Sequence, residues 1–133
     1  MIEISTDNNR IDLEAVHQFL TKSYWAKGRT IEEVKRSIDN SLNFGVYLNN
    51  DQIGFARICT DYTVFAYLMD LFILPEHQGK GYAKELIRII LEEPALKTCK
   101  VWMLKTKDAH RLYKNFSFTD LKNPERLMER ILK

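Results

Sequence analysis

Residues 65–74 are almost continuously apolar, and Asp70 is their one charged member. A run of this length, with several residues that suit a pleated surface, predicts a strand buried on both faces of a sheet. Pro75 has no N–H for a sheet ladder, so the strand should end before it. The apolar positions that follow have the spacing of one helix face: Ala83, Leu86, Ile87, Ile90 and Leu91. They predict a helix that packs on the sheet and is closed by Pro94.

Shorter patterns on either side predict further strands and helices. Strands are expected over residues 2–5, 44–48, 53–60, 100–105 and 118–121. The turn Asn49-Asn50-Asp51 would join the second of these to the third. Helices are expected after Asp12 and Asp108 as N-caps, and after Thr30, which forms a capping-box pattern with Glu33.

A last helix is expected after Asn123-Pro124, with Leu127, Met128 and Ile131 turned inward. The complete order is then β-α-α-β-β-β-α-β-α-β-α. It indicates an α/β (α+β) fold, in which a mixed, mostly antiparallel central sheet carries helices on both faces.

Composition narrows the class of protein. The chain has 133 residues, 45% hydrophobic and 29% charged, which is typical of one globular domain over residues 1–133. A net charge of +2, without a basic stripe, gives no reason to expect a nucleic-acid partner. No apolar run reaches membrane-spanning length and no signal-peptide pattern occurs, so a cytoplasmic location is expected, without a membrane partner.

The cysteines and histidines do not form a recognisable site in the sequence. Cys59 and Cys99 are isolated in apolar contexts and are expected to be buried thiols without a disulfide. His17, His77 and His110 lack the spacing of metal ligands, so no metal is expected.

The segment between the apolar strand and its helix reads Gln78-Gly79-Lys80-Gly81-Tyr82-Ala83. Two glycines allow a tight turn and the close approach of another group. The first N–H groups of a helix lack intrahelical partners and lie at the positive end of its dipole, where a phosphate binds well. The alternative is a connection in which the glycines serve the turn alone.

Two motifs together resemble those of the GNAT N-acetyltransferases. The pattern Gln-x-x-Gly-x-Ala at Gln78, Gly81 and Ala83 resembles their acetyl-CoA signature. Residues 109–118 resemble their A-x-x-LY-x-x-x-GF pattern, with Ser117 where glycine is usual. The resemblance covers roughly residues 2–121 and implies the same mixed fold.

The resemblance implies a cofactor site for acetyl-CoA. Backbone N–H groups would hold its pyrophosphate at Gln78, Gly79, Lys80, Gly81, Tyr82, Ala83 and Lys84. The preceding strand carries a bulge in this family, so that the N–H of Leu71 would face the thioester carbonyl and Ile73 would bind the pantetheine arm.

The resemblance also suggests catalytic groups. Tyr113 would protonate the leaving thiolate, although it also fits the apolar stripe of its helix and can be a core residue. Asp70 would orient a cationic amine or relay its proton, or it is a solvent-facing or Arg57-paired carboxylate. Glu76, Asp61 and Asp108 are further candidates for the base.

The acceptor site is expected near the loop after the first helix. Tyr24 and Trp25 either line this site or fix the loop to the core. Arg57 either faces water or meets an acidic substrate group or Asp70. Tyr62 and Phe65 complete the residues that suggest a compact aromatic pocket.

These residues predict an enzyme that transfers acetyl from acetyl-CoA to a primary amine of a small molecule, by direct attack in a ternary complex. The alternative is a non-catalytic module of the same fold that binds CoA or an amine. A phosphate-binding NTPase is disfavoured because the Gly-x-x-x-x-Gly-Lys-[Ser/Thr] motif does not occur. A monomer and a homodimer are both compatible with the sequence.

Overall fold

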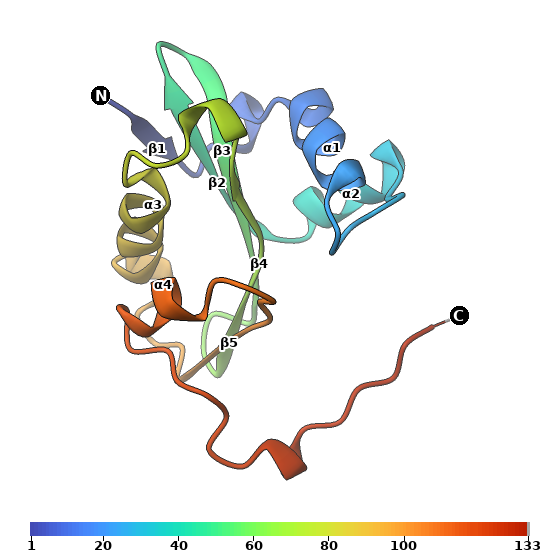
Figure 1. The fold of residues 1–133 in the computed structure, drawn as a ribbon, viewed down its shortest axis with the longest axis vertical. Helices are drawn as coiled ribbons and strands as arrows, with labels where there is room; N and C mark the ends of the chain where they lie inside the picture. The colour runs from blue at the N-terminus through green and yellow to red at the C-terminus, as the bar shows by residue number, and fades with distance from the viewer. Residues whose placement is uncertain (133) are drawn as a thin grey trace.

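The computed structural model describes residues 1–132. Its strands are β1 (Glu3–Ser5), β2 (Leu42–Leu48), β3 (Asp51–Thr60), β4 (Phe65–Ile73) and β5 (Val101–Leu104). Its helices are α1 (Leu13–Lys22), α2 (Ile31–Asp39), α3 (Tyr82–Leu91) and α4 (His110–Lys114). Figure 1 shows α1 and α2 on one face of the sheet and α3 and α4 on the other.

The strands form one sheet in the order β1-β2-β3-β4-β5. All neighbours are antiparallel except β4 and β5, which run parallel. The predicted turn joins β2 to β3, and Asn49 and Asn50 adopt left-handed φ values of 50° and 69°. The prediction of a mixed, mostly antiparallel sheet with helices on both faces is confirmed.

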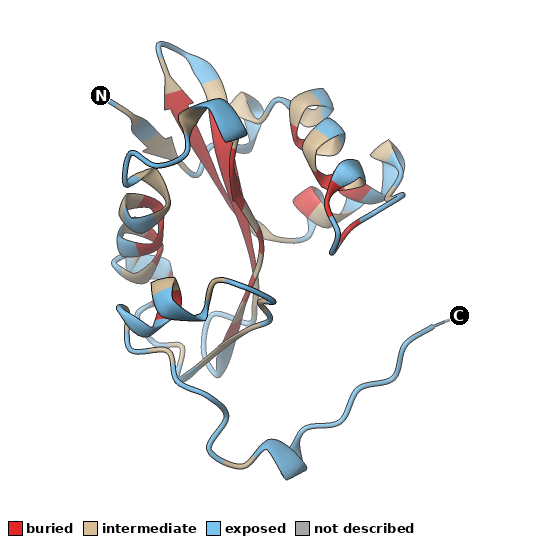
Figure 2. Ribbon diagram, in the orientation of Figure 1, coloured by how far each residue is buried: buried red, intermediate tan, exposed pale blue. Residues whose placement is uncertain are grey.

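A hydrophobic core lies on each face of the sheet (Figure 2). On one side the predicted stripe of α3 is buried through Leu86, Ile87 and Ile90. On the other, Val16 of α1 and Val34 of α2 pack in a cluster with Phe72 of β4. The predicted caps of α1 and α2 are confirmed: the Asp12 carboxylate accepts from the Ala15 N–H at 3.1 Å, and Thr30 forms the capping box with Glu33.

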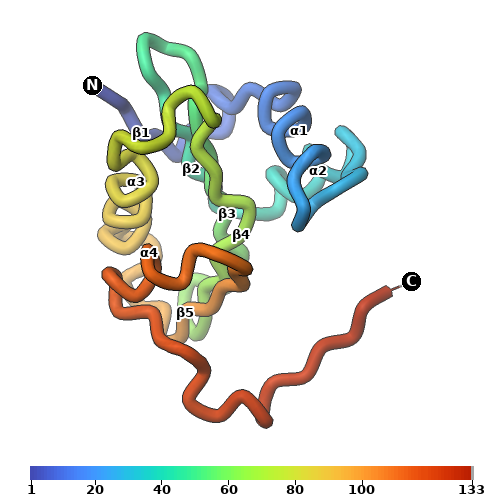
Figure 3. The backbone as a smooth tube through the Cα atoms, in the orientation of Figure 1, coloured from blue at the N-terminus to red at the C-terminus, as the bar shows by residue number. Residues whose placement is uncertain are grey.

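Strand β4 has a bulge in its middle. Its register with β3 shifts between Phe55 and Arg57, and Asp70 takes a φ of 55° at that point. The parallel pairing with β5 ends at Leu68, which is opposite Leu104. Figure 3 shows β5 beside the lower end of the sheet. Within residues 1–132, the second half of β4 therefore has a strand neighbour on one edge alone.

Two predictions for the C-terminal residues are wrong. Residues 118–121 form no strand, and Asn123-Pro124 begins a single 3-10 turn (Pro124–Arg126) in place of a helix. The expected inward stripe of Leu127, Met128 and Ile131 is exposed, with Met128 at 92% (Figure 2). A short helix needs a surface against which to bury its apolar face, and this segment extends away from the body of the chain (Figure 1).

Two further expectations need correction. Asp108 is not the cap of α4: Ala109 holds the N-cap position, and its N–H donates to the Thr106 hydroxyl at 3.0 Å. Strand β4 is not buried on both faces along its length, since Phe65 is exposed while Tyr67 and Met69 are half-buried. Tyr67 and Met69 line an open cavity beside the sheet, and Phe65 is the first residue of the strand.

Candidate functional site

The glycine turn opens onto a groove between β4 and α3. Gly79 and Gly81 have φ values of +79° and +83°, and a Cβ at either position would meet no atom within 4 Å. Gly81 is the N-cap of α3 and offers no side chain to its first N–H groups. The Gln78 amide donates to the carbonyl of Ile73 at 2.9 Å and fastens the turn to β4.

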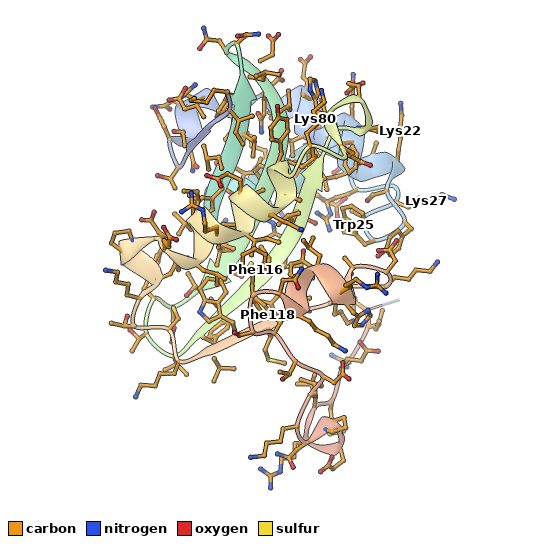
Figure 4. All side chains as sticks on the ribbon, turned by 60° about the vertical axis from the view of Figure 1, so that its left-hand side comes forward. Lys22, Trp25, Lys27, Lys80, Phe116 and Phe118 are labelled. Carbon is orange, nitrogen blue, oxygen red and sulfur yellow. The ribbon has the colours of Figure 1, made fainter. Side chains whose placement is uncertain are left out.

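This groove is a cavity of about 490 Å³. Its walls come from β4, the glycine turn, the start of α3 and the start of α4, and include Leu71, Ile73, Gln78, Gly79, Gly81, Tyr82, Ala83 and Lys84. Lys80 is not among the lining residues, and Figure 4 labels it at the turn. The structure therefore brings eight of the nine residues expected around the cofactor to one cavity.

The free edge of β4 faces the same groove. The Leu74 N–H donates to the Ile53 carbonyl of β3 at 2.8 Å. Successive residues of a strand direct their N–H groups to opposite edges, so the N–H of Ile73 points away from β3. That edge has no strand partner within residues 1–132. The Ile73 carbonyl on it accepts from Gln78, and the Ile73 N–H is open to a ligand.

A second cavity, also of about 490 Å³, lies on the other side of β4's bulge. Its lining comes from the loop after α1, from β4, β5 and α4, and from the connection between β5 and α4. It includes Tyr24, Trp25, Arg29, Tyr67, Asp70, Leu104, Thr106 and Tyr113. The two cavities share Trp25, Leu71, Asp108, Ala109 and Leu112. A ligand in one can therefore meet a ligand in the other beside Leu71.

Asp70 is the centre of a buried polar cluster below the second cavity. One of its oxygens, Oδ1, accepts from the Trp25 indole Nε1 at 3.0 Å. The other, Oδ2, accepts from Arg29 Nη1 at 2.8 Å and from Arg57 Nε at 2.9 Å. The pairing of Asp70 with Arg57 was one alternative of the sequence analysis. Arg57 itself does not line the cavity and lies behind Asp70.

The loop between α1 and α2 is held in place from both ends. The Ser23 hydroxyl donates to the Leu20 carbonyl at 2.7 Å, and the Gly28 N–H donates to the Thr21 carbonyl at 3.1 Å. The rings of Tyr24 and Trp25 meet edge to face, 5.2 Å between centroids. The Tyr24 hydroxyl accepts from the Lys107 N–H at 3.3 Å, which ties the loop to the connection before α4.

Tyr113 projects from α4 into the second cavity and is otherwise buried. Its ring packs edge to face on Phe118, which packs with Phe116 against the α3-side core (both labelled in Figure 4). Burial, with a smaller contribution from Tyr24, raises the pKa of Tyr113 to about 12. The hydroxyl therefore stays protonated at neutral pH and can act as a hydrogen-bond donor.

Some expected residues lie elsewhere. Tyr62 and Phe65 line neither cavity and are exposed. The Asp61 carboxylate accepts from the N–H groups of Thr63 and Val64, and these bonds hold its pKa below the usual range. Asp61 thus stabilises its own loop and lines neither cavity.

Among the candidates for the base, Asp108 alone lines both cavities. Arg29 was not assigned a role from the sequence, although it follows two aromatic residues and a glycine in an unusual loop.

The described residues offer no metal centre or membrane segment. Within residues 1–132, no group of three or more His, Cys, Asp or Glu side chains is placed to hold a metal ion. No helix in that part of the chain has both the length and the apolar character needed to cross a membrane. Cys59 and Cys99 are free thiols and are half-buried, less than the sequence suggested.

Comparison with known proteins gives consistent matches. The model of the acetyltransferase (GNAT) family matches residues 10–118. A crystal structure of a GNAT-family protein from Xanthomonas campestris pv. campestris is 41% identical with a TM-score of 0.97, over 99% of this chain and 94% of that one. A Gibberella zeae protein assigned to the acetyltransferases is 28% identical over 141 residues, which span 88% of this chain and 78% of its own.

A more distant structure was solved with acetyl-CoA. It comes from Clostridium acetobutylicum, is 18% identical and has a TM-score of 0.75, over 98% of this chain and 96% of that one. At this level of identity the likeness is one of fold.

Proposed function

The chain belongs to the acetyltransferase (GNAT) family, and we propose that it transfers the acetyl group of acetyl-CoA to a primary amine of a small molecule. One observation carries the proposal. The glycine turn at the start of α3 and the open edge of β4 line one cavity, which meets a second cavity at Leu71. The first suits a long cofactor with a phosphate end, and the second suits an acceptor.

The glycine turn would hold the pyrophosphate. The N–H groups of the turn and of the first turn of α3 have no side-chain cap, and the helix dipole favours a negative charge there. Lys84 lines the cavity and adds positive charge, whereas Lys80 does not reach it. The pantetheine arm would bind along the free edge of β4 at Ile73, which leaves the thioester carbonyl beside the N–H of Leu71.

The reaction would be direct. The neutral amine nitrogen attacks the thioester carbon, the tetrahedral oxyanion is stabilised by the Leu71 N–H, and the C–S bond then breaks. The thiolate takes a proton from the Tyr113 hydroxyl, and the amine loses a proton to a base. Tyr113 regains its proton from solvent between turnovers.

The hydrogen bonds of Asp70, with the place of Asp108 in the two cavities, support one choice of base. Both oxygens of Asp70 already accept hydrogen bonds from protein donors, one from Trp25 and the other from Arg29 and Arg57. We therefore assign Asp70 a positioning role, in which it holds Arg29 and Trp25 at the acceptor cavity. Asp108 lines both cavities and is exposed, so it is the better candidate for the base.

Calorimetric titration with acetyl-CoA tests the cofactor site. Micromolar binding is expected, and Gly81→Glu should abolish it by placing an anionic side chain in the phosphate site. The matched control is Gly28→Glu, because Gly28 has the same φ of about +81° and the same open surroundings in the loop after α1. Wild-type protein that does not bind acetyl-CoA would contradict the proposal. Binding without CoA release from any amine would favour the non-catalytic module.

The substitution Tyr113→Phe tests whether Tyr113 is the general acid. Removal of a general acid lowers kcat by about 10²–10⁴-fold. The dissociation constant for acetyl-CoA should stay unchanged, because Tyr113 does not line the cofactor groove. Equal kcat values for the variant and the wild type would exclude the assignment.

A further inference from the structure

The polar cluster at the acceptor cavity contains two guanidinium groups and one carboxylate. The side chains of Arg57 and Asp70 are 9% and 1% exposed, and that of Arg29 is 20% exposed. One carboxylate neutralises one guanidinium, so the cluster carries a net charge of +1 with little access to water. A charge removed from water is costly unless an opposite charge lies next to it.

Within residues 1–132, Asp70 is the one carboxylate that pairs with either guanidinium. The other hydrogen-bond partners of the Arg57 guanidinium among residues 1–132 are the Ser41 hydroxyl at 3.0 Å, the Cys59 sulfur at 3.1 Å and the Met69 sulfur at 3.4 Å. These side chains accept hydrogen bonds as neutral groups. The excess positive charge therefore remains available to a ligand.

Arg29 is the member of the cluster that faces the cavity. It uses Nη1 to bind Asp70, and within residues 1–132 its side chain makes no second hydrogen bond. A guanidinium has five N–H donors in a planar fork that fits a carboxylate or a phosphate. Because Asp70 fixes the fork at one corner, the other donors are pre-oriented for an anion in the cavity.

The other basic side chain on the wall of this cavity is already paired. Lys105 Nζ binds Glu129 at 2.9 Å and both groups are well exposed. Arg29 is thus the strongest anion-binding group that the cavity presents. Asp108, where the two cavities meet, offers a negative charge to the amine end of the same ligand.

We propose that the acceptor carries an anionic group, a carboxylate or a phosphate monoester, which binds to Arg29 while its amine faces the thioester. This inference rests on the proposed function, since it names the class of amine that the second cavity takes. Tyr24, Trp25 and Tyr67 line the cavity and would contact the organic part between the two charged ends.

A direct binding experiment tests the anion site without turnover. The indole N–H resonance of Trp25 is a local reporter, because its Nε1 donates to the same carboxylate as Arg29. Titration with sodium acetate and, separately, with inorganic phosphate should shift this resonance in a saturable way. Arg29→Met should remove the shift, and Arg36→Met, an exposed arginine on α2, should leave it intact. Identical titrations of wild type and Arg29→Met would overturn the inference.

Matched substrates test the same site during turnover, and separate its two sources of anion. The pairs are L-phenylalanine with L-phenylalaninamide, and phosphoethanolamine with ethanolamine. The rate of CoA release measures the acetylation of each amine. The anionic member of at least one pair should have a kcat/KM about tenfold or more above its neutral partner. Arg29→Met should abolish that preference, and Arg29→Lys should keep part of it.

The two proposals fail in different ways. Neutral amines acetylated as fast as their anionic partners would overturn the inference and leave the acetyltransferase proposal standing. A chain that does not bind acetyl-CoA would contradict the acetyltransferase proposal, while the Trp25 titration would still show whether Arg29 binds anions. If none of the four amines is acetylated, the Trp25 titration decides whether Arg29 binds an anion in the cavity.

Discussion

At the scale of single residues, Asp70 is the most informative position. It is the one charged residue of an apolar strand, and the sequence identified it for that reason. In the structure its carboxylate joins β3, β4 and the loop after α1, through Arg57, Trp25 and Arg29. The Asp70 carboxylate itself is buried, and its bonds to Arg29 and Trp25 connect the sheet to the wall of the second cavity.

The substitution Asp70→Asn should strongly destabilise the protein. It leaves two guanidinium groups beside a neutral amide, and loss of one partner from a buried ion pair costs about 3–5 kcal/mol. Urea denaturation measures the free energy of unfolding. Asp39→Asn is the control, because Asp39 binds Lys35 at 2.7 Å on the exposed surface of α2 and its loss should cost less than about 1 kcal/mol. Equal losses in both variants would refute the argument.

The raised pKa of Tyr113 predicts that the folded protein loses stability at alkaline pH. Its pKa is raised from 10.0 to about 12 in the folded state, so the folded protein holds the phenolic proton more tightly than the unfolded chain. This difference in pKa contributes on the order of 2–3 kcal/mol to the free energy of unfolding. The contribution is fully present below about pH 10 and is lost as the pH rises from about 10 to 12.

Urea midpoints across that pH range, compared between wild type and Tyr113→Phe, isolate this contribution. Every other titrating group is common to the two proteins. The wild type should show the steeper decline, and parallel curves would contradict the raised pKa.

At the scale of elements, α2 positions the loop between α1 and α2, which carries Arg29. Its N-cap is Thr30, which follows Arg29 directly and forms both bonds of the capping box with Glu33. The cap thus determines where α2 starts and, with it, where the Arg29 backbone leaves the loop. A defect at this cap should affect the acceptor site before the cofactor site.

Thr30→Ala should lower the free energy of unfolding by about 1 kcal/mol, which is the usual cost of losing a cap. It should also raise the KM for the acceptor and leave the dissociation constant for acetyl-CoA unchanged. Asp12→Ala, at the cap of α1, is the matched control and should lower stability alone. A Thr30 variant with unchanged acceptor kinetics would show that the loop is held by its other contacts.

Features that depend on residues close together in the chain could be predicted from the sequence. The stripe of α3, the capping box of α2 and the turn at Asn49-Asn50 are examples. The bulge of β4 could not be read from its residues, since an apolar run has the same pattern with or without an extra residue. The family resemblance alone suggested it.

At the scale of the whole molecule, the two cavities exist because parts of the sheet diverge. Pairing of β4 with β5 stops at Leu68, and the loop after α1 crosses toward the connection before α4 through Tyr24 and Lys107. The floor of both cavities is therefore one strand, and their outer walls come from distant segments of the chain.

The C-terminal segment should add little to stability. Residues 121–132 bury no side chain, and the one ion pair that joins them to residues 1–120, Lys105 with Glu129, is exposed. A variant that ends at Lys122 should keep its free energy of unfolding within about 0.5 kcal/mol of the wild type. Urea denaturation measures this difference. A larger loss, together with a lower mass by light scattering, would indicate that the segment packs in an assembly.

The amino-acid sequence by itself determined the strands and helices with strong local patterns and the glycine turn with its phosphate-binding character, whereas Tyr113 became a candidate acid through the family resemblance. These features depend on spacing along the chain and on the chemistry of single residues. Only the tertiary structure decided that Asp70 is bound by two arginines, that Arg29 faces the acceptor cavity and that the C-terminal apolar residues are exposed. Each of these depends on which distant segments meet, and burial and charge balance are set at those contacts.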